Sequence, residues 1–214
     1  MEAAEAGIGL VVCITEGIPV QDMVKVKLYL QGRNTRLIGP NCPGIITPDE
    51  CKIGIMPGYI HKAGNVGVIS RSGGMTTEMS STLTAAGLGQ STAVSIGGDA
   101  IIGSSYAELM PLFEADEQTE AIVIYTEPGG RMEAELARYV TEESTRKLPI
   151  VAFMAGRFMD EMPGMSFGHA GTIVEGKADT AAEKIKRLAD AGITVAEEIS
   201  EIPDLVKEKL GVAA

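Results

Sequence analysis

The sequence predicts an α/β protein built around a doubly wound, parallel β-sheet. Short β-branched runs alternate with longer stretches of helical period along most of the chain. With 214 residues, of which 45% are hydrophobic, the chain is long enough for one large core or two small ones. It contains 26 glycines and no tryptophan, so we expect many tight turns and a core of aliphatic side chains and methionine.

The first elements form only a fragment of such a sheet. We expect a strand over residues 8–14, a helix over 19–31 and a short strand over 36–38. Two short parallel strands are not stable alone as an open sheet, so a missing segment or a partner subunit is expected to cover their edges. Residues 39–64 contain four prolines and several glycines, which predicts an irregular linker and a domain boundary near residues 62–65.

Beyond this linker, strands and helices alternate regularly. The strands are expected at residues 66–70, 91–96, 121–125, 150–154 and 194–196. The helices that follow them are expected at residues 75–86, 105–114, 132–143, 180–191 and 202–210. Right-handed crossovers place such helices on both faces of a parallel sheet, and ligands bind at the carboxyl ends of its strands. We therefore look for functional residues in the loops that follow the strands.

The charge of the chain argues against several kinds of partner. Eighteen Lys and Arg residues against 29 Asp and Glu residues give a formal net charge of -11, which repels nucleic acids and anionic membrane surfaces. No run approaches the roughly 18 apolar residues of a membrane-spanning helix, and the first residues lack the basic region of a signal peptide. We therefore expect a cytoplasmic protein that binds neither nucleic acid nor membrane.

The three cysteines have no CxxC spacing, which indicates neither a disulfide framework nor a zinc site. Cys42 lies between two prolines, and no basic neighbour is evident that would make its thiol nucleophilic. We therefore interpret Cys42 as a positioned, non-catalytic cysteine. Cys13 and Cys51 are interpreted as structural.

The turn after the expected strand at 66–70 is a candidate phosphate site. An apolar strand runs there directly into a serine- and glycine-rich turn and then into a helix, through Ser70, Arg71, Ser72, Gly73 and Gly74. Unpaired N–H groups and the positive end of the helix dipole attract an anion, and the glycines let it approach closely. A simple serine-capped turn is the alternative, because neither the P-loop spacing nor the GxGxxG spacing is present.

A histidine and an acid are expected at the same edge of the sheet. His169 is flanked by small residues, which suits a general base, a metal ligand, a phosphoryl acceptor or a loop histidine without chemistry. A metal is disfavoured because no second His or Cys is near in sequence. Glu127 follows the strand at 121–125. Beside His169 it would fix one ring tautomer and leave the other nitrogen free to attack phosphorus, whereas alone it would be a solvated acid.

Five motifs follow one another over nearly all of the chain: ITEGIP at 14–19, IGPNCPG at 38–44, SRSGG at 70–74, SIGGD at 95–99 and GHAG at 168–171. In this order, they resemble the α subunit of succinyl-CoA synthetase. The resemblance implies a partial Rossmann-like CoA-binding domain with a linker over residues 1–62. It also implies a flavodoxin-like phosphohistidine ligase domain over residues 63–214. The SRSGGM and FGHAG segments, with the longer loop at 157–167, are also similar to ATP-citrate lyase.

The same resemblance implies roles for individual residues. His169 matches the histidine that is phosphorylated, and Glu127 matches the acid that contacts it. The turn at 70–74 matches the start of the helix whose dipole stabilises the phosphoryl group. Thr77 stands where a tyrosine usually contacts the carboxylate substrate. The positions that match contacts to coenzyme A are Ile14, Thr15, Glu16, Asn41 and Cys42.

The activity implied by the resemblance is that of an ADP- or GDP-forming succinate–CoA ligase. It would use coenzyme A, a small dicarboxylate, and ATP or GTP with Mg²⁺ bound on an ATP-grasp β subunit; no metal ligand is assigned in this chain. Alternatives remain open. The first alternative is a subunit of a related ligase for citrate or another dicarboxylate. The second is a non-catalytic docking subunit, and the third is a truncated chain whose other half completes the sheet in trans.

Overall fold

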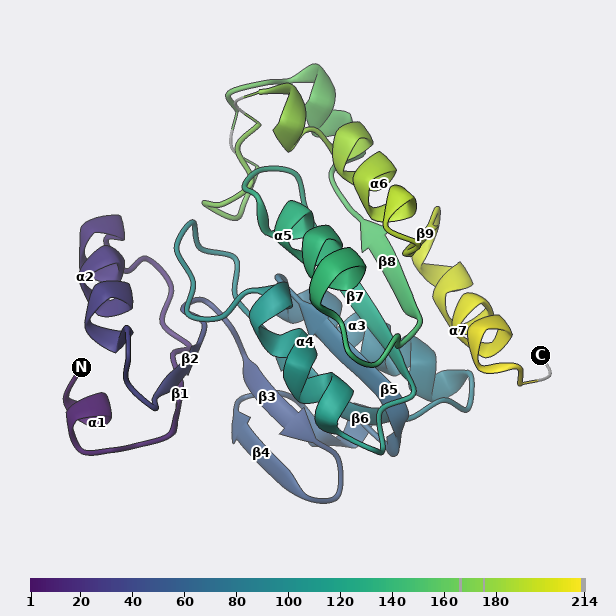
Figure 1. Ribbon diagram of the computed structural model, residues 1–214, viewed down its shortest axis with the longest axis horizontal. Helices are drawn as coiled ribbons and strands as arrows, with labels where there is room; N and C mark the ends of the chain where they lie inside the picture. The colour runs from purple at the N-terminus through teal and green to yellow at the C-terminus, as the bar shows by residue number, and fades with distance from the viewer. Residues whose placement is uncertain (166, 175, 213–214) are drawn as a thin grey trace.

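A computed structural model describes residues 1–165, 167–174 and 176–212 of the chain. Within these residues the strands form a small two-stranded sheet and a large seven-stranded sheet. Figure 1 shows the small sheet beside the large one, with helices on both faces of the latter. None of the described helices is long and apolar enough to cross a membrane.

The N-terminal elements form a small parallel unit, drawn in purple in Figure 1. Strand β1 pairs in parallel with β2, so the two short strands expected here are confirmed. The connecting helix α2 leaves apolar side chains exposed along one face, with Val20 at 55% and Leu28 at 60%. The bounds of this unit are α1 (Glu2–Glu5), β1 (Leu10–Val12), α2 (Val20–Leu30) and β2 (Arg36–Ile38).

The five strands expected beyond residue 62 are all present and all parallel. They are β5 (Ala63–Ser70), β6 (Gln90–Ser95), β7 (Ala121–Thr126), β8 (Ile150–Met154) and β9 (Thr194–Ala196). Their spatial order, β6-β5-β7-β8-β9, is the flavodoxin-like order, in which the direction of winding reverses between the first and third strands. That switch point lies between β5 and β7, so ligands are expected where Ser70 and Thr126 end these strands.

The helices cover the large sheet from both sides. Helices α3 and α7 pack on one face, and α4, α5 and α6 pack on the other. Side chains along β7 alternate between the two cores: Val123 faces α3 and α7, whereas Ile122 and Ile124 face the other three helices. The helix bounds are α3 (Gly73–Ala85), α4 (Tyr106–Ala115), α5 (Met132–Arg138), α6 (Ala181–Asp190) and α7 (Ile202–Leu210).

The expectation of an irregular linker over residues 39–64 is wrong for its central part. Strands β3 (Gly44–Thr47) and β4 (Cys51–Gly54) form an antiparallel hairpin there, and β3 also pairs with β6 at the edge of the large sheet. Pro43 and Pro48 flank β3 rather than interrupt it, so no backbone N–H donor is lost from the hydrogen bonds between the strands. Gly44 and Gly54 face each other so closely that a Cβ on either would overlap the opposite backbone.

The remaining helical segments are short. The helix expected at 132–143 ends as a π-helical turn over Tyr139–Glu143, and 3₁₀ turns occupy Gly58–Ile60, Arg157–Glu161, Lys177–Asp179 and Ile199–Glu201. Asp160 anchors the long loop between β8 and α6, because its carboxylate accepts from Ala181 N at 2.7 Å and from Ala182 N at 3.0 Å. This contact ties the loop that contains His169 to the start of α6.

Candidate functional site

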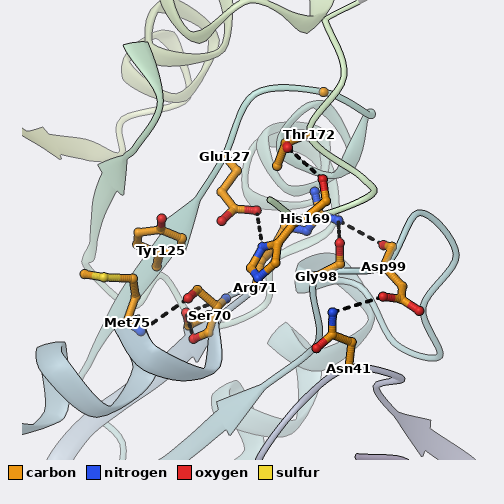
Figure 2. A network of polar contacts seen from close by, with 12 residues as sticks. Asn41, Ser70, Arg71, Met75, Gly98, Asp99, Tyr125, Glu127, His169 and Thr172 are labelled. Atoms are coloured by element: carbon orange, nitrogen blue, oxygen red, sulfur yellow. Dashed lines mark hydrogen bonds and ion pairs between the residues drawn. The ribbon is translucent and has the colours of Figure 1, made fainter. Parts of the chain in front are cut away.

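His169 and Glu127 form a hydrogen-bonded pair at the carboxyl edge of the large sheet (Figure 2). Glu127 directly follows β7, and its Oε2 accepts from His169 Nδ1 at 2.9 Å. The side chain of Glu127 is 9% exposed and that of His169 is 26% exposed. Because Nδ1 is engaged by the carboxylate, Nε2 is the ring nitrogen left for other chemistry.

The charges around His169 favour its protonated form. The hydrogen bond that His169 donates to Glu127 raises the pKa of His169, burial of the ring lowers it, and the charge of Glu127 raises it further. Two further charges have smaller effects on the pKa of His169: Arg71 lowers it and Glu16 raises it. A neutral, nucleophilic imidazole therefore becomes more abundant as the pH rises through this elevated pKa. Burial and Glu127 also raise the pKa of Tyr125, so that its phenol stays protonated.

The imidazole of His169 lies against the backbone of Gly98. A Cβ at Gly98 would overlap the ring, so only glycine fits without displacing it. Gly98 N donates to Asn41 O at 3.3 Å, and Gly171 N donates to Gly98 O at 3.3 Å. Thr172 closes the loop by donating from its hydroxyl to His169 O at 2.8 Å. The turn after β6 thus supports the histidine loop, and Figure 2 shows Gly98 beside His169.

The start of helix α3 is the second component of the site. Ser72 caps the helix, with its Oγ accepting from Met75 N at 3.3 Å. The cap is itself held by Ser70, whose Oγ donates to Ser72 O at 2.8 Å and accepts from Ser72 N at 3.1 Å. A Cβ at Gly74 would meet nothing within 4 Å. Since the first N–H groups of a helix have no acceptor within it, this open turn suits an anion.

One cavity of about 430 Å³ connects the histidine with the helix start. Its wall includes His169 and the expected substrate position Thr77. The other predicted residues that line it are Ser72, Gly73 and Gly74 from the helix start and Ile14, Asn41 and Cys42 from the N-terminal unit. The structure therefore brings together eight of the residues singled out from the sequence, drawn from four separate segments.

Two predicted phosphate contacts, Ser70 and Arg71, do not line this cavity. Both are buried; Ser70 supports the cap of α3, and Arg71 donates from Nη2 to Asp99 O at 3.0 Å. Two predicted coenzyme A contacts also lie elsewhere. The main-chain oxygen of Thr15 accepts from Asn41 N at 2.9 Å, and Glu16 lines another cavity, of about 310 Å³, whose wall includes Gly168 and Ala170 of the histidine loop.

The thiol of Cys42 is buried. Burial raises the pKa of Cys42 to about 11, so the thiol is protonated at neutral pH. Its Sγ donates to Cys13 O at 3.4 Å. These contacts agree with the interpretation of Cys42 as a non-catalytic cysteine in the wall of the site.

In the described part of the chain, no group of three His, Cys, Asp or Glu residues could hold a metal ion.

Sequence reasoning overlooked a buried pair behind Glu127. Lys184 Nζ lies 2.6 Å from Glu133 Oε2. A signal was available, because Lys184 occupies the apolar stripe of its helix, three residues after Ala181 and four before Leu188, where a charge is unexpected. The supporting role of Gly98 carried no such signal, since it depends on the packing of two distant loops.

The fold and the site together define a class of protein. A CoA-ligase family model matches residues 69–194, which include strands β6, β7 and β8 of the large sheet together with Glu127 and His169. The chain therefore belongs to the CoA-ligase family. The expected succinyl-CoA synthetase resemblance is confirmed by relatives named as subunit α of ADP-forming succinate–CoA ligase.

Two of these relatives come from staphylococci. The protein from Staphylococcus epidermidis is 54% identical over 202 residues, and that from Staphylococcus aureus is 53% identical over 202 residues. In both comparisons the match covers 94% of this chain and 66% of the relative. The chain thus spans slightly less than two thirds of the length of these relatives.

Solved structures with the same fold include two CoA enzymes. ATP citrate lyase from Methanothrix soehngenii, in complex with citrate and coenzyme A, matches 97% of this chain and 36% of its own, with a TM-score of 0.85 and 25% identity. An acetyl-coenzyme A synthetase from Ca. Korarchaeum cryptofilum, in complex with phosphate and ADP, matches 97% of this chain and 44% of its own, with a TM-score of 0.78 and 24% identity. At 24% identity, the likeness to the acetyl-coenzyme A synthetase shows only that the two chains share a fold.

Proposed function

We propose that the chain is the phosphohistidine-bearing α subunit of an acid–CoA ligase that acts on succinate. The observation that carries this proposal is the single cavity in which His169, fixed by Glu127, faces the open start of helix α3. Membership of the CoA-ligase family supports it. The names of the staphylococcal relatives support succinate and ADP as substrates.

The pair of His169 and Glu127 suits phosphoryl transfer. In the proposed direction, phosphate attacks the thioester carbonyl of succinyl-CoA, which releases coenzyme A and forms succinyl phosphate. Nε2 of neutral His169 then attacks the phosphorus; the N–P bond forms as the P–O bond to the acyl group breaks, and succinate leaves with the electron pair. The proton on Nδ1 remains in the hydrogen bond to Glu127.

The start of α3 would stabilise the charge that moves through this step. A phosphoryl group at the turn of Gly73 and Gly74, which is open at Gly74, would accept from backbone N–H groups and lie at the positive end of the helix dipole. These donors are already in place before the reaction, so no reorganisation is needed as charge develops. Ser70 and Arg71 act indirectly in this proposal, through the cap and through the turn that supports the histidine loop.

The N-terminal wall of the cavity is the proposed place for the thiol end of coenzyme A. Ile14, Asn41 and Cys42 line it beside His169, and the protonated Cys42 thiol does not compete as a nucleophile. We retain residues 1–62 as part of a CoA-binding domain and residues 63–214 as the ligase domain. The hairpin β3–β4 then belongs structurally to the sheet of the ligase domain, because β3 pairs with β6.

The nucleotide belongs to a partner in this proposal. An ATP-grasp β subunit would bind ADP or GDP with Mg²⁺ and take the phosphoryl group from His169, which restores the neutral imidazole. The relatives' designation as an α subunit supports such a partner. A second candidate substrate is citrate, favoured by the structural likeness to a citrate- and coenzyme A-bound ATP citrate lyase. Thr77, in the wall of the cavity, is the proposed contact for the carboxylate.

Labelling of the complex with the co-expressed β subunit tests the proposal. After incubation with γ-labelled ATP or GTP, we expect an acid-labile, base-stable label on this chain that disappears in the His169→Ala variant. The matched control is His61→Asn, which changes the one other histidine of the chain, at a site outside the cavity. Succinate with coenzyme A, and separately citrate with coenzyme A, should be compared for their ability to discharge the label.

The outcomes separate the alternatives. Label that persists in His169→Ala would rule out His169 as the acceptor. A well-formed complex that takes no label would favour the non-catalytic docking subunit. Discharge by citrate and not by succinate would replace the proposed substrate.

A further inference from the structure

A buried ion pair lies behind the site, between helices α5 and α6. The side chains of Lys184, on α6, and Glu133, on α5, are 1% and 0% exposed. Removing two charges from water is costly and must be offset by good hydrogen bonds. A pair of apolar side chains would pack these helices at lower cost, so the contacts of the pair indicate a further role.

Lys184 uses all three donors of its ammonium group. Besides Glu133, it donates to the main-chain oxygens of Glu127, at 3.1 Å, and of Gly129. An ammonium has three N–H donors, so its hydrogen-bonding capacity is filled. Both carbonyls belong to the turn that follows β7 and carries the Glu127 side chain. The ammonium therefore holds this turn at two points, one of them at Glu127 itself.

The same turn packs against the backbone of the loop that carries His169. Gly129 has a φ of +84°, and a Cβ there would crowd the backbone of Gly171 and Ile173, so the two segments are in direct contact. Gly129 N also donates to Asp179 O at 3.0 Å, at the far end of that loop. A shift of the turn would therefore displace both the Glu127 carboxylate and the loop that carries His169.

We infer that Lys184 is a positioning residue for phosphoryl transfer: it tethers the Glu127–Gly129 turn so that Glu127 holds His169 in its reactive tautomer and orientation. The inference rests on the proposed function for its consequence in the reaction. Glu133 serves as the counter-charge, since its Oε2 binds Lys184 while its Oε1 has no hydrogen-bond partner in the part of the chain that the structure describes.

Three variants separate the tether from the ion pair. Lys184→Met with Glu133→Leu removes both charges, keeps much of the volume and breaks both bonds to the turn. Glu133→Gln removes the counter-charge but leaves the two carbonyl bonds of Lys184 in place. Lys186→Met is the matched control, because Lys186 is exposed on the same helix. If the first variant does not fold, Lys184→Gln with Glu133→Gln is used instead. It keeps a hydrogen-bonded pair between the helices, but the shorter side chain at position 184 no longer reaches the main-chain oxygens of Glu127 and Gly129.

The first readout is the titration of His169 by NMR in the folded chain. His169 is one of two histidines, so a His61→Asn variant assigns its signal. Glu127, Arg71 and Glu16 are the charged groups that influence the ring, and none of them changes in these variants. Loss of the tether should move the pKa of His169 down towards its ordinary value. Glu133→Gln and Lys186→Met should leave it unchanged.

The second readout is the rate of phosphohistidine formation in the complex with the β subunit. A displacement near 1 Å at a reacting group slows a reaction by about a hundredfold, so we expect a loss of roughly tenfold to a hundredfold in the tether variants. A folded tether variant with an unchanged titration and rate would overturn the inference. Wild-type complex that takes no label, while the variants still shift the titration, would overturn the proposed function and leave the tether standing.

Discussion

The two sides of the candidate site are held in place by contacts of very different range. The start of α3 is a local structure, because Ser72 caps it through Met75, three residues along the chain. The histidine side depends on distant residues: His169 bonds to Glu127, 42 positions away, and its loop rests on Gly98. The anion-binding side should therefore tolerate change better than the side that orients the nucleophile.

Glu127→Gln should have the largest effect, because it removes the charge that fixes the ring while preserving shape. Loss of a carboxylate that orients a catalytic histidine costs on the order of 10³- to 10⁴-fold in rate, and we expect a similar loss in phosphohistidine formation. Labelling of the complex measures it. Glu117→Gln, at an exposed position, is the control and should match the wild type. A loss below tenfold would show that Glu127 does not orient the nucleophile.

The pH profile of the same variant sharpens this test. The hydrogen bond that His169 donates to Glu127 raises the pKa of His169, so labelling of the wild type should increase as pH rises through a midpoint above the ordinary histidine value. In Glu127→Gln the midpoint should move down. The raised pKa also adds folding stability below the ordinary value, which is lost as pH rises through the elevated one. An upward shift in the variant would contradict this electrostatic account.

Gly98→Ala should have the next largest effect. The added methyl group overlaps the His169 ring, so the ring must move while the sheet remains intact. We expect labelling to slow by about a hundredfold with little change in the midpoint of thermal unfolding. Gly58→Ala is the control, since a Cβ at Gly58 meets nothing within 4 Å and its φ is not positive. If Gly98→Ala is labelled as fast as the wild type, the loop that carries His169 adjusts freely and Gly98 does not position the ring.

Ser72→Ala should have the smallest effect. Loss of an N-cap costs about 1 kcal/mol of unfolding free energy, and the helix dipole remains, so labelling should fall by less than about tenfold. Ser105→Ala is the matched control, because Ser105 caps α4 outside the cavity. Both variants should lose similar stability in chemical denaturation. Only Ser72→Ala should slow labelling; a similar slowing in both would assign the effect to stability alone.

Most of the large sheet was predictable from the sequence. The strand over Ile150–Met154 was predicted to the residue, and all five parallel strands were expected in the right places. Buried parallel strands are continuous β-branched runs, so their pattern is strong and local. The hairpin of β3 and β4 was missed, because two facing glycines and flanking prolines resemble a linker until the pairing of Gly44 with Gly54 is known.

The site was predictable in part for a similar reason. His169, Glu127 and the turn at Gly73 and Gly74 were named from their motifs and their positions after strands, and the structure gathers them at one edge. Arg71 was expected at the phosphate, but it lies buried beneath the neighbouring loop. A basic residue in a glycine-rich turn looks the same in sequence whether it faces a ligand or a carbonyl.

The sequence by itself determined the α/β class, the five parallel strands, the cap of α3 and the residue types that carry the proposed chemistry. These features depend on local periodicity and on neighbours within a few positions. Only the tertiary structure decided which nitrogen of His169 is engaged, that Gly98 supports the ring, and that Lys184 holds the turn of Glu127. Those contacts join segments tens of residues apart, and their geometry depends on how the helices and loops pack around the sheet.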